Sequence, residues 1–263
     1  MNKMLLDVIN DIKAGWQKRE LWQYASVMEM KQRYRRSILG PFWISLSLAI
    51  MMMSIGILWS QLWNIPVQEY LPYFTVGLLL WTLISAVIGE STQVFIKHTG
   101  IIKQIRLPLS YYVFSSVWKN FTIFIHHFVV YILVIIYFKV NLSWSFVLII
   151  PGIMLYFINF VWISACLGIL STRYRDIEQI VPTILSILFF MTPIIWKMGW
   201  SGKKALFVYL NPLYHMLEIL RAPLLGYMPT MHNYISMLIL TMIGMIVSLF
   251  LVGKYHKRVS YWL

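Results

Sequence analysis

Residues 31–43 read Lys-Gln-Arg-Tyr-Arg-Arg-Ser-Ile-Leu-Gly-Pro-Phe-Trp, and they lead directly into Phe42–Trp63, which carries no charge. A segment of this length is long enough for a helix to cross the hydrocarbon core of a bilayer. The cations beside it favour the cytoplasmic side, where anionic headgroups attract them. Gly40-Pro41 breaks the chain where a surface helix has to turn into the membrane. This junction therefore predicts a membrane protein with a basic N-terminal segment at the cytoplasmic surface.

The composition also indicates that lipid surrounds most of the protein. Of the 263 residues, 60% are hydrophobic and 12% are charged, which is too much apolar surface for a soluble domain of this size. The net charge is +13, and the basic residues lie in the segments between apolar runs. Membrane lipid is therefore the expected partner, and nucleic acid is not. Cys166 is the only cysteine, which excludes an internal disulfide and a cysteine-based metal site. Residues 1–41 are charged throughout, and we expect no cleavable signal peptide there.

Six apolar stretches are near or above the roughly 20 residues that a helix needs to cross a bilayer. They are Phe42–Trp63, Tyr70–Gly89, Ser110–Phe138, Asn141–Thr172, Gln179–Trp196 and Asn233–Gly253. They lack the alternation of a membrane barrel, so we predict an all-helical membrane protein with six spans in one domain, residues 1–263. Lys and Arg are concentrated in residues 1–41, 97–106, 173–175 and 254–258, which places both termini in the cytoplasm.

The N-terminal segment is amphipathic, and its apolar residues share one helical face up to a break near Gly15. These residues are Leu5, Val8, Ile9, Ile12 and Trp16. Such a helix is expected to lie in the membrane interface without crossing the bilayer.

Four parts of the sequence resemble one family, the membrane permeases of ABC transporters that export O-antigen, capsule or teichoic acid. The junction matches at Lys31, Arg33, Tyr34, Arg35, Ser37, Leu39, Gly40 and Trp43. The cytoplasmic loop matches at Arg173, Arg175 and Asp176, and the fifth predicted span ends with Thr192-Pro193-Ile194. The loop before the sixth span contains Asn211-Pro212-Leu213, Glu218 and Arg221, similar to the family's outer-loop signature.

The resemblance implies a fold, a function and partners. Two copies of the chain would enclose one path, and two separate ATP-binding subunits would hold ATP and Mg²⁺. The chain itself would bind no cofactor and catalyse no reaction. The exported substrate would be a lipid-linked polysaccharide, O-antigen first, which crosses the bacterial inner membrane from the cytoplasm. The resemblance also places substrate contacts at the junction, for which we select Lys31, Arg33, Tyr34, Arg35, Arg36 and Trp43.

The first cytoplasmic loop, residues 97–108, is predicted to form a short helix. Ile101, Ile102 and Ile105 would make its apolar side, while its cations stay in water. The resemblance implies that this loop docks into the ATP-binding subunit, and the alternative is a loop that rests on the membrane. The residues selected for coupling are Lys97, Gly100, Ile101, Lys103, Arg106 and Pro108.

Two apolar runs between the fifth and sixth spans, residues 205–210 and 213–220, are too short to span. We expect re-entrant or interfacial helices there. The resemblance implies an outer gate at Asn211, Pro212, Glu218 and Arg221, and the alternative is a folded cap without a gating role.

Aromatic side chains could line a path for a polymer, because a flat ring contacts the C–H face of a sugar without binding it tightly. Trp81 lies near the middle of its predicted span, and packing against a neighbouring helix is an equally good interpretation. The candidates for the path are Trp59, Trp63, Trp81, Phe189, Phe190 and Trp196.

Glu90 and Lys119 are the full charges that fall in or beside the predicted spans. Consecutive spans are antiparallel and usually neighbours, which brings both residues to a similar depth, so we predict an ion pair between them. The sequence is equally compatible with separate exposure, Lys119 reaching the headgroups and Glu90 the cytoplasm. His126 and His127 are adjacent in the sequence and point in different directions on a helix, so we predict no metal site.

The sequence contains no G-x-x-x-x-G-K-[ST] phosphate loop, so a second polypeptide would have to supply the energy of transport. A drug- or small-lipid-exporting ABC permease is the nearest alternative, because its topology is similar. An ion-coupled transporter would normally carry several carboxylates within its spans or an internal repeat. A glycan-modifying enzyme would need a paired acid and base in a cleft.

Overall fold

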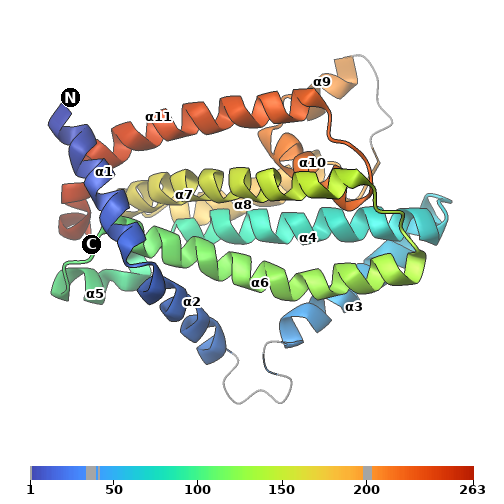
Figure 1. Ribbon diagram of the computed structural model, residues 1–263, viewed down its shortest axis with the longest axis horizontal. Coiled ribbons are helices and arrows are strands. Elements are labelled where there is room, and N and C mark those ends of the chain that lie inside the picture. Colours follow the sequence, from blue (N-terminus) through green and yellow to red (C-terminus); the bar gives the residue numbers. More distant parts are fainter. Residues whose placement is uncertain (1, 34–39, 41, 198–202) are drawn as a thin grey trace.

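The computed structural model describes residues 2–33, 40, 42–197 and 203–263, and the secondary structure of these residues is helical (Figure 1). The long helices are α3 (Phe42–Leu62), α4 (Val67–Ser91), α6 (Leu109–Phe138), α7 (Ile149–Arg173) and α11 (Met231–Trp262). The shorter ones are α1 (Asn2–Gln17), α2 (Arg19–Arg33), α5 (Thr99–Gln104), α8 (Ile177–Met191), α9 (Lys203–Tyr209) and α10 (Pro212–Leu224). Two 3₁₀ turns, η1 (Ile96–His98) and η2 (Trp144–Leu148), precede α5 and α7.

Within the described residues, five helical segments are long and apolar enough to cross a membrane. They are α3, α4, α6, η2 with α7, and α11, which correspond to the predicted first, second, third, fourth and sixth spans. The helix predicted over Gln179–Trp196 is wrong at its end, because α8 stops at Met191. Thr192 is extended, since the residue before a proline avoids the helical conformation. The 15 residues of α8 are about 22 Å long, less than the hydrocarbon thickness of about 30 Å.

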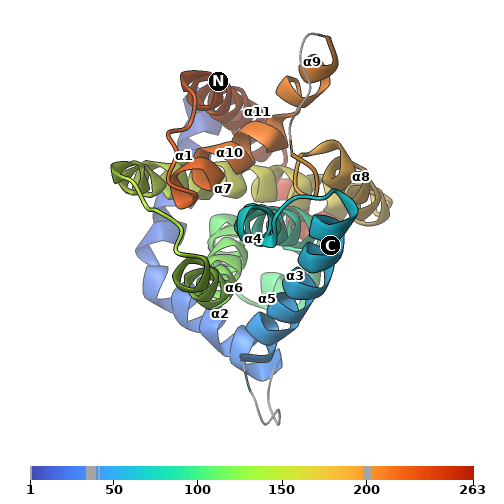
Figure 2. The ribbon, with the colours of Figure 1, turned by 90° about the vertical axis from the view of Figure 1, so that its right-hand side faces the viewer.

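Helix α4 forms the core of the bundle. In the most apolar 18 residues of α4, 72% are buried, whereas the corresponding share in the other long helices is 17–22%. Figure 2 shows α4 in the middle, and α3, α6, α7, α8 and α10 all pack against it. The outer helices therefore expose many large apolar side chains, which is the surface expected of helices that contact lipid.

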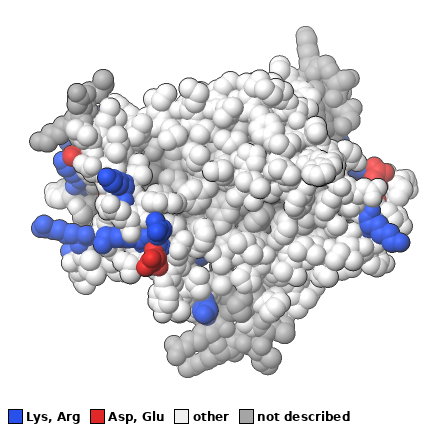
Figure 3. Space-filling view, in the orientation of Figure 1, with Lys and Arg blue, Asp and Glu red and all other residues white. Residues whose placement is uncertain are grey.

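Both chain termini lie at one end of the bundle, together with α5; we call this the terminal end (Figure 1). The turns between α3 and α4 and between α6 and η2 lie at the opposite end. On the face drawn in Figure 3, charged side chains lie toward these two ends and leave an uncharged band between them. An uncharged band with charged borders is the distribution expected of a membrane protein.

The predicted N-terminal helix forms as α1, and α2 continues it as a separate helix. Both pack against α6, and α1 also contacts α11. The predicted apolar face is only partly covered: Val8 is buried, whereas Ile9, Ile12 and Trp16 are exposed. The reason is that α1 contacts the bundle along a narrow strip, so most of its apolar face is left for another surface.

Candidate functional site

Three polar contacts fix α1 and α2 to α6 at the terminal end. The first is made by Asp11, whose two carboxylate oxygens accept hydrogen bonds from the backbone N–H groups of Leu109 and Ser110, each at 2.9 Å. These N–H groups begin α6, where they lack partners within the helix and where the helix dipole attracts a negative charge. The Ser110 hydroxyl also donates to the Asp11 backbone carbonyl at 2.6 Å. Asp11 therefore connects α1 to the residues that directly follow the 97–108 loop.

The second contact joins the middle of α2 to α6, where the Ser26 hydroxyl donates to the carbonyl of Ser115 at 2.8 Å. The third is electrostatic. Lys119 Nζ lies 2.8 Å from Glu29 Oε1 of α2 and 2.8 Å from Glu90 Oε2 of α4. Asn120 donates to the same Glu90 oxygen at 3.0 Å. The predicted pair of Glu90 and Lys119 is therefore confirmed, and Glu29 makes it a three-residue charge cluster, Glu29–Lys119–Glu90.

The predicted short helix within residues 97–108 is confirmed as η1 and α5. Its isoleucines differ in exposure: Ile102 packs against a small apolar cluster that includes Phe95 and Tyr112, whereas Ile101 and Ile105 are 44% and 54% exposed. The selected residues Lys97, Gly100, Lys103 and Arg106 are exposed, and Pro108 precedes the first turn of α6. The loop thus presents two apolar side chains among cations, beyond the end of the bundle.

The junction is described only at its edges. Lys31 is exposed near the end of α2, and Trp43 is half-exposed at the start of α3. The Arg33 backbone ends α2. The Arg33 side chain and the predicted site residues Tyr34, Arg35 and Arg36 lie outside the described residues.

The second cytoplasmic motif contacts the C-terminal helix. The guanidinium of Arg173 lies over the rings of Tyr174 at 5.1 Å and Trp262 at 5.4 Å. Arg175 and Asp176 are exposed in the turn that precedes α8. The geometry therefore ties the end of α7 to the end of α11 and leaves two charges free to meet another surface.

At the opposite end, the non-helical residues Thr192–Trp196 cross between α4 and α10. Their backbone carbonyls are bound by side chains from both helices, because α8 has ended and no helical partner is available. Tyr70 donates to the carbonyl of Ile195 at 2.5 Å, and the Tyr73 hydroxyl lies 2.9 Å from that of Pro193 and 3.1 Å from that of Trp196. Arg221 donates to the Pro193 carbonyl at 2.5 Å.

The predicted outer-gate residues lie beside this non-helical segment, residues 192–196. Asn211 caps α10 by accepting from the Leu213 N–H at 3.0 Å, and its amide donates to the Thr192 hydroxyl at 2.8 Å. Pro212 follows as the first residue of α10, where a missing N–H costs nothing. Arg221 is buried and forms an ion pair with Glu218, which is three residues earlier on the same helix. We call Thr192, Asn211, Glu218 and Arg221 with Tyr70 and Tyr73 the outer cluster.

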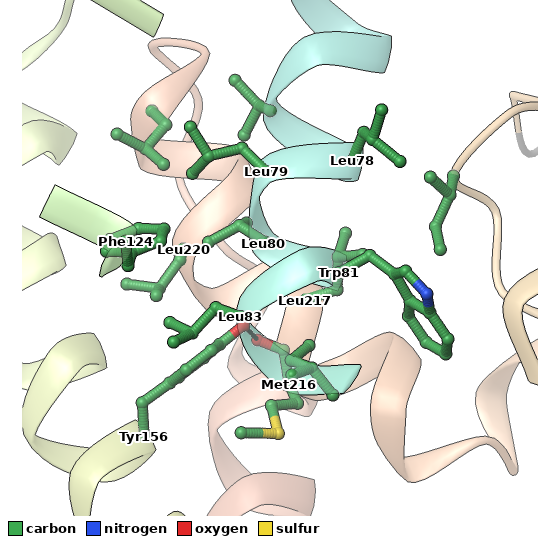
Figure 4. Close-up of a cluster of buried hydrophobic side chains, with 14 of the residues drawn as sticks. Leu78, Leu79, Leu80, Trp81, Leu83, Phe124, Tyr156, Met216, Leu217 and Leu220 are labelled. Carbon is green, nitrogen blue, oxygen red and sulfur yellow. Dashed lines mark hydrogen bonds between the residues drawn. The ribbon is translucent and has the colours of Figure 1, made fainter. Parts of the chain in front are cut away.

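The aromatic candidates for a path differ in how far they are buried. Trp81 is 7% exposed and lies 5.6 Å from Phe189 of α8, as the packing interpretation predicts. Figure 4 shows its ring directed away from Phe124 and Leu220. Phe190 is exposed on the outer surface of α8. A role of these rings in a path stays a prediction.

Trp59 and Trp63 form an aromatic group beside the outer cluster, with ring centroids 4.9 Å apart and Trp63 edge-on to Tyr70. Trp196 donates from its indole nitrogen to the carbonyl of Phe190 at 3.1 Å, which holds the ring over the end of α8. His126 makes a hydrogen bond to the Thr122 carbonyl. In the part of the chain that the structure describes, three or more His, Cys, Asp or Glu residues never gather as metal ligands would.

Sequence reasoning missed Asp11, Glu29, Tyr70 and Tyr73. Asp11 is one of several acids in the N-terminal segment, and nothing in the sequence indicated which helix start it would reach. The two tyrosines resemble ordinary interfacial aromatics in the sequence.

Comparison with known proteins gives one family. The family described as ABC-2 type transporter matches residues 20–225. The chain is 24% identical to the O-antigen export system permease protein RfbA of Myxococcus xanthus, over 78% of this chain and 82% of the relative. Two proteins of the same name from Klebsiella pneumoniae are 26% and 24% identical, over 82% and 87% of this chain and 86% and 90% of their own length.

Proposed function

This chain belongs to the ABC-2 type transporter family, and we propose that it is the membrane permease subunit of an ATP-driven exporter of lipid-linked polysaccharide. The substrate we propose first is O-antigen. The observation that carries the proposal is similarity over most of both chains to three O-antigen export permeases. The match extends from α2 through the outer cluster, so it covers both ends of the bundle.

We propose six crossings, with α8 as the fifth. Helix α7 ends near the C-terminal end of α11, as the contact of Arg173 with Trp262 requires. Asn211 at the start of α10 contacts Thr192 at the opposite end. The chain between α7 and Asn211 therefore has to traverse the bundle, and α8 with the non-helical residues 192–196 supplies the length. Both termini, the cations of the terminal end and the 97–108 loop then face the cytoplasm of the bacterial inner membrane.

The geometry supports a route for energy coupling. Two separate ATP-binding subunits would bind ATP and Mg²⁺, and Ile101 and Ile105 would provide the apolar contact with one of them. The end of the loop is continuous with the N-terminus of α6, to which Asp11 ties α1. Displacement of the loop by the ATP-binding subunit would therefore move α6 and the interface helices α1 and α2 together. The same motion would reach α4 through the Glu29–Lys119–Glu90 cluster.

The way residues 192–196 are held at the opposite end supports an outer gate formed by two copies of the chain. In the segment from Thr192 to Trp196, the carbonyls of Pro193, Ile195 and Trp196 are bound by side chains of helices α4 and α10. Such a segment can shift as a unit when the helices that hold it separate. A passage for polymer would then open along α8 and the neighbouring aromatic residues Trp59, Trp63 and Trp196.

The test is genetic and chemical. Deletion of the gene in its own bacterium should remove long-chain polysaccharide from the cell surface and leave lipid-linked polymer inside the cell. Expression of the chain together with its ATP-binding subunit should restore the surface polymer. A deletion strain with normal surface polysaccharide would contradict the proposal. Loss of capsule alone, with O-antigen intact, would change the substrate and preserve the transporter class.

A further inference from the structure

A hollow of about 580 Å³ opens at the opposite end of the bundle, beside the outer cluster. This volume lies within the range of small-molecule binding sites. Its walls come from four separate parts of the chain: the start of α4, the turn after α6, Lys197 beyond the 192–196 segment, and the turn after α10. The side chains used in the argument are Gln68, Glu69, Tyr73, Asn141, Lys197 and Tyr227.

The backbone around the hollow is fixed by close packing. Gly226 has a φ of +85°, a conformation that side chains other than glycine rarely adopt. A Cβ atom at this position would also lie 2.2 Å from the carbonyl oxygen of Asn141. The turn after α10 is therefore pressed against the turn after α6, and this contact places Tyr227 and Asn141 on the same hollow.

One wall is rigid because its polar groups are already bound. The Tyr73 hydroxyl reaches the carbonyls of the 192–196 segment, and the Arg221 guanidinium lies over the Tyr73 ring at 4.4 Å. Lys197 pairs with Glu69 at 2.5 Å and lies 5.5 Å from the centre of the same ring. The lysine charge is thereby balanced, so the described residues that line the hollow leave no excess positive charge to attract a phosphate.

Other groups around the hollow are free to bind a ligand. The side chains of Gln68 and Asn141 are exposed and make no hydrogen bond with any part of the chain that the structure describes. The ring of Tyr227 is 70% exposed. By contrast, the large hollows beside α6 and α7 are lined mainly by apolar side chains, which suit lipid tails.

We infer that the hollow beside Tyr73 and Tyr227 is a saccharide-binding subsite for the exported glycan. The inference rests on the proposed function. A sugar presents hydroxyl groups that both donate and accept, which amide side chains such as Gln68 and Asn141 match. It also presents a C–H face that packs on an aromatic ring such as Tyr227. An uncharged, hydroxyl-rich ligand fits a hollow in which Lys197 is already paired with Glu69.

Tyr73 gives the subsite a connection to the outer cluster. Its ring forms part of the hollow, while its hydroxyl supports the carbonyls of Pro193 and Trp196. A sugar held in the hollow would therefore contact the same side chain that holds the 192–196 segment. This position suits a contact that retains the leading sugars of the polymer after they have passed the gate.

The experiment measures saccharide binding by the permease in complex with its ATP-binding subunit, reconstituted in lipid nanodiscs. The probe is polysaccharide released by mild acid from the surface of the strain that encodes this chain, and dextran of similar size is the reference. Tyr227→Ala should weaken binding about tenfold, on the scale of one ring contact. Tyr227→Phe keeps the ring and should bind as the unmodified chain does. Tyr261→Ala removes a highly exposed tyrosine in the last turn of α11 and is the matched control.

Gln68→Ala tests the polar side of the hollow independently, should Tyr227→Ala fail to fold. Equal affinity of the unmodified chain, Tyr227→Ala and Gln68→Ala, or no preference over dextran, would overturn the subsite. The deletion strain separates the two proposals. If it loses surface polymer while the variants bind normally, export stands and the subsite falls. If it keeps surface polymer, the proposed function fails and the subsite fails with it.

Discussion

The ammonium of Lys119 lies 2.8 Å from the Glu90 carboxylate and links α6 to α4 inside the bundle. The Lys119 side chain is almost fully buried, and Glu90 is largely buried. Glu29 of α2 binds the same ammonium. One cation on α6 therefore connects this helix to α2 and α4 near the terminal end. Both of these helices move in the proposed mechanism.

Removal of one partner from this cluster should cost more stability than removal of both. Lys119→Met leaves Glu90 with an uncompensated charge, and a loss of about 3 kcal/mol is expected for a buried pair. Glu90→Gln combined with Lys119→Met should recover part of that loss. The measurement is a double-mutant cycle on thermal unfolding in detergent. Strictly additive changes would show that the two side chains do not interact.

A second prediction concerns the contact between α1 and the start of α6. Asp11→Ala removes the acceptor for two N–H groups at a helix N-terminus, a change that typically costs about 1 kcal/mol. It should also lower polysaccharide export, because α1 would no longer follow α6. Asp7→Ala is the control, since Asp7 pairs with Lys257 near the surface, and an ion pair of this kind is worth about 0–1 kcal/mol. Equal export by both variants would deny Asp11 a role in coupling.

The sequence was sufficient for the features that depend on periodicity and charge. The boundaries of α3 and α6 each differ from the predicted spans by one residue, since long apolar runs in lipid have few alternatives to a helix. The predicted pair of Glu90 and Lys119 followed from the depth of each residue in neighbouring spans. These features are local, or need only the rule that consecutive spans are adjacent.

The features that the sequence did not predict depend on how separate helices are placed. Glu29 joins the charge cluster because α2 lies along α6, and periodicity gives no register between an interface helix and a span. The early end of α8 carried a signal in Pro193, but the apolar run continued past it to Trp196. The contact of Thr192 with Asn211 links two motifs that the sequence showed only as separate matches.

A third prediction concerns the basic junction, which we expect to hold the phosphates of the lipid-linked substrate. Arginine binds phosphate through two parallel hydrogen bonds, which lysine does not reproduce. Arg33→Ala with Arg35→Ala should therefore lower export more than Lys13→Ala with Lys18→Ala. The measurement is surface polysaccharide at equal expression of each variant. Equal losses would reduce the junction to a signal for membrane orientation.

A fourth prediction concerns the outer cluster. Arg221→Met leaves the largely buried Glu218 carboxylate unpaired and removes one donor from the Pro193 carbonyl, so it should destabilise the protein by about 3 kcal/mol. Arg221→Met combined with Glu218→Gln should be less severe. Asn211→Ala removes the cap of α10 and should cost about 1 kcal/mol. Thermal unfolding in detergent gives all three values, and an Arg221→Met variant as stable as the unmodified protein would contradict the arrangement.

The last prediction uses the different exposure of three isoleucines in the 97–108 loop. Ile101 and Ile105 are open to a partner, whereas Ile102 packs on the protein's own apolar cluster. If the loop docks into an ATP-binding subunit, cysteines at 101 and 105 should form cross-links with cysteines placed on that subunit. A cysteine at 102 should not, and it serves as the control because it differs from its neighbour by one position on the same short helix.

The same variants distinguish docking from a loop that rests on the membrane. A loop in the interface would leave cysteines at 101 and 105 reactive toward lipid-soluble reagents and without cross-links to the ATP-binding subunit. Docking should protect both positions when the subunit is present and expose them when it is removed. ATP hydrolysis by the complex should also fall when Ile101 and Ile105 are both replaced by Asp, since an apolar contact would then bury two charges. Unchanged hydrolysis and export in that variant would exclude these side chains from the coupling surface.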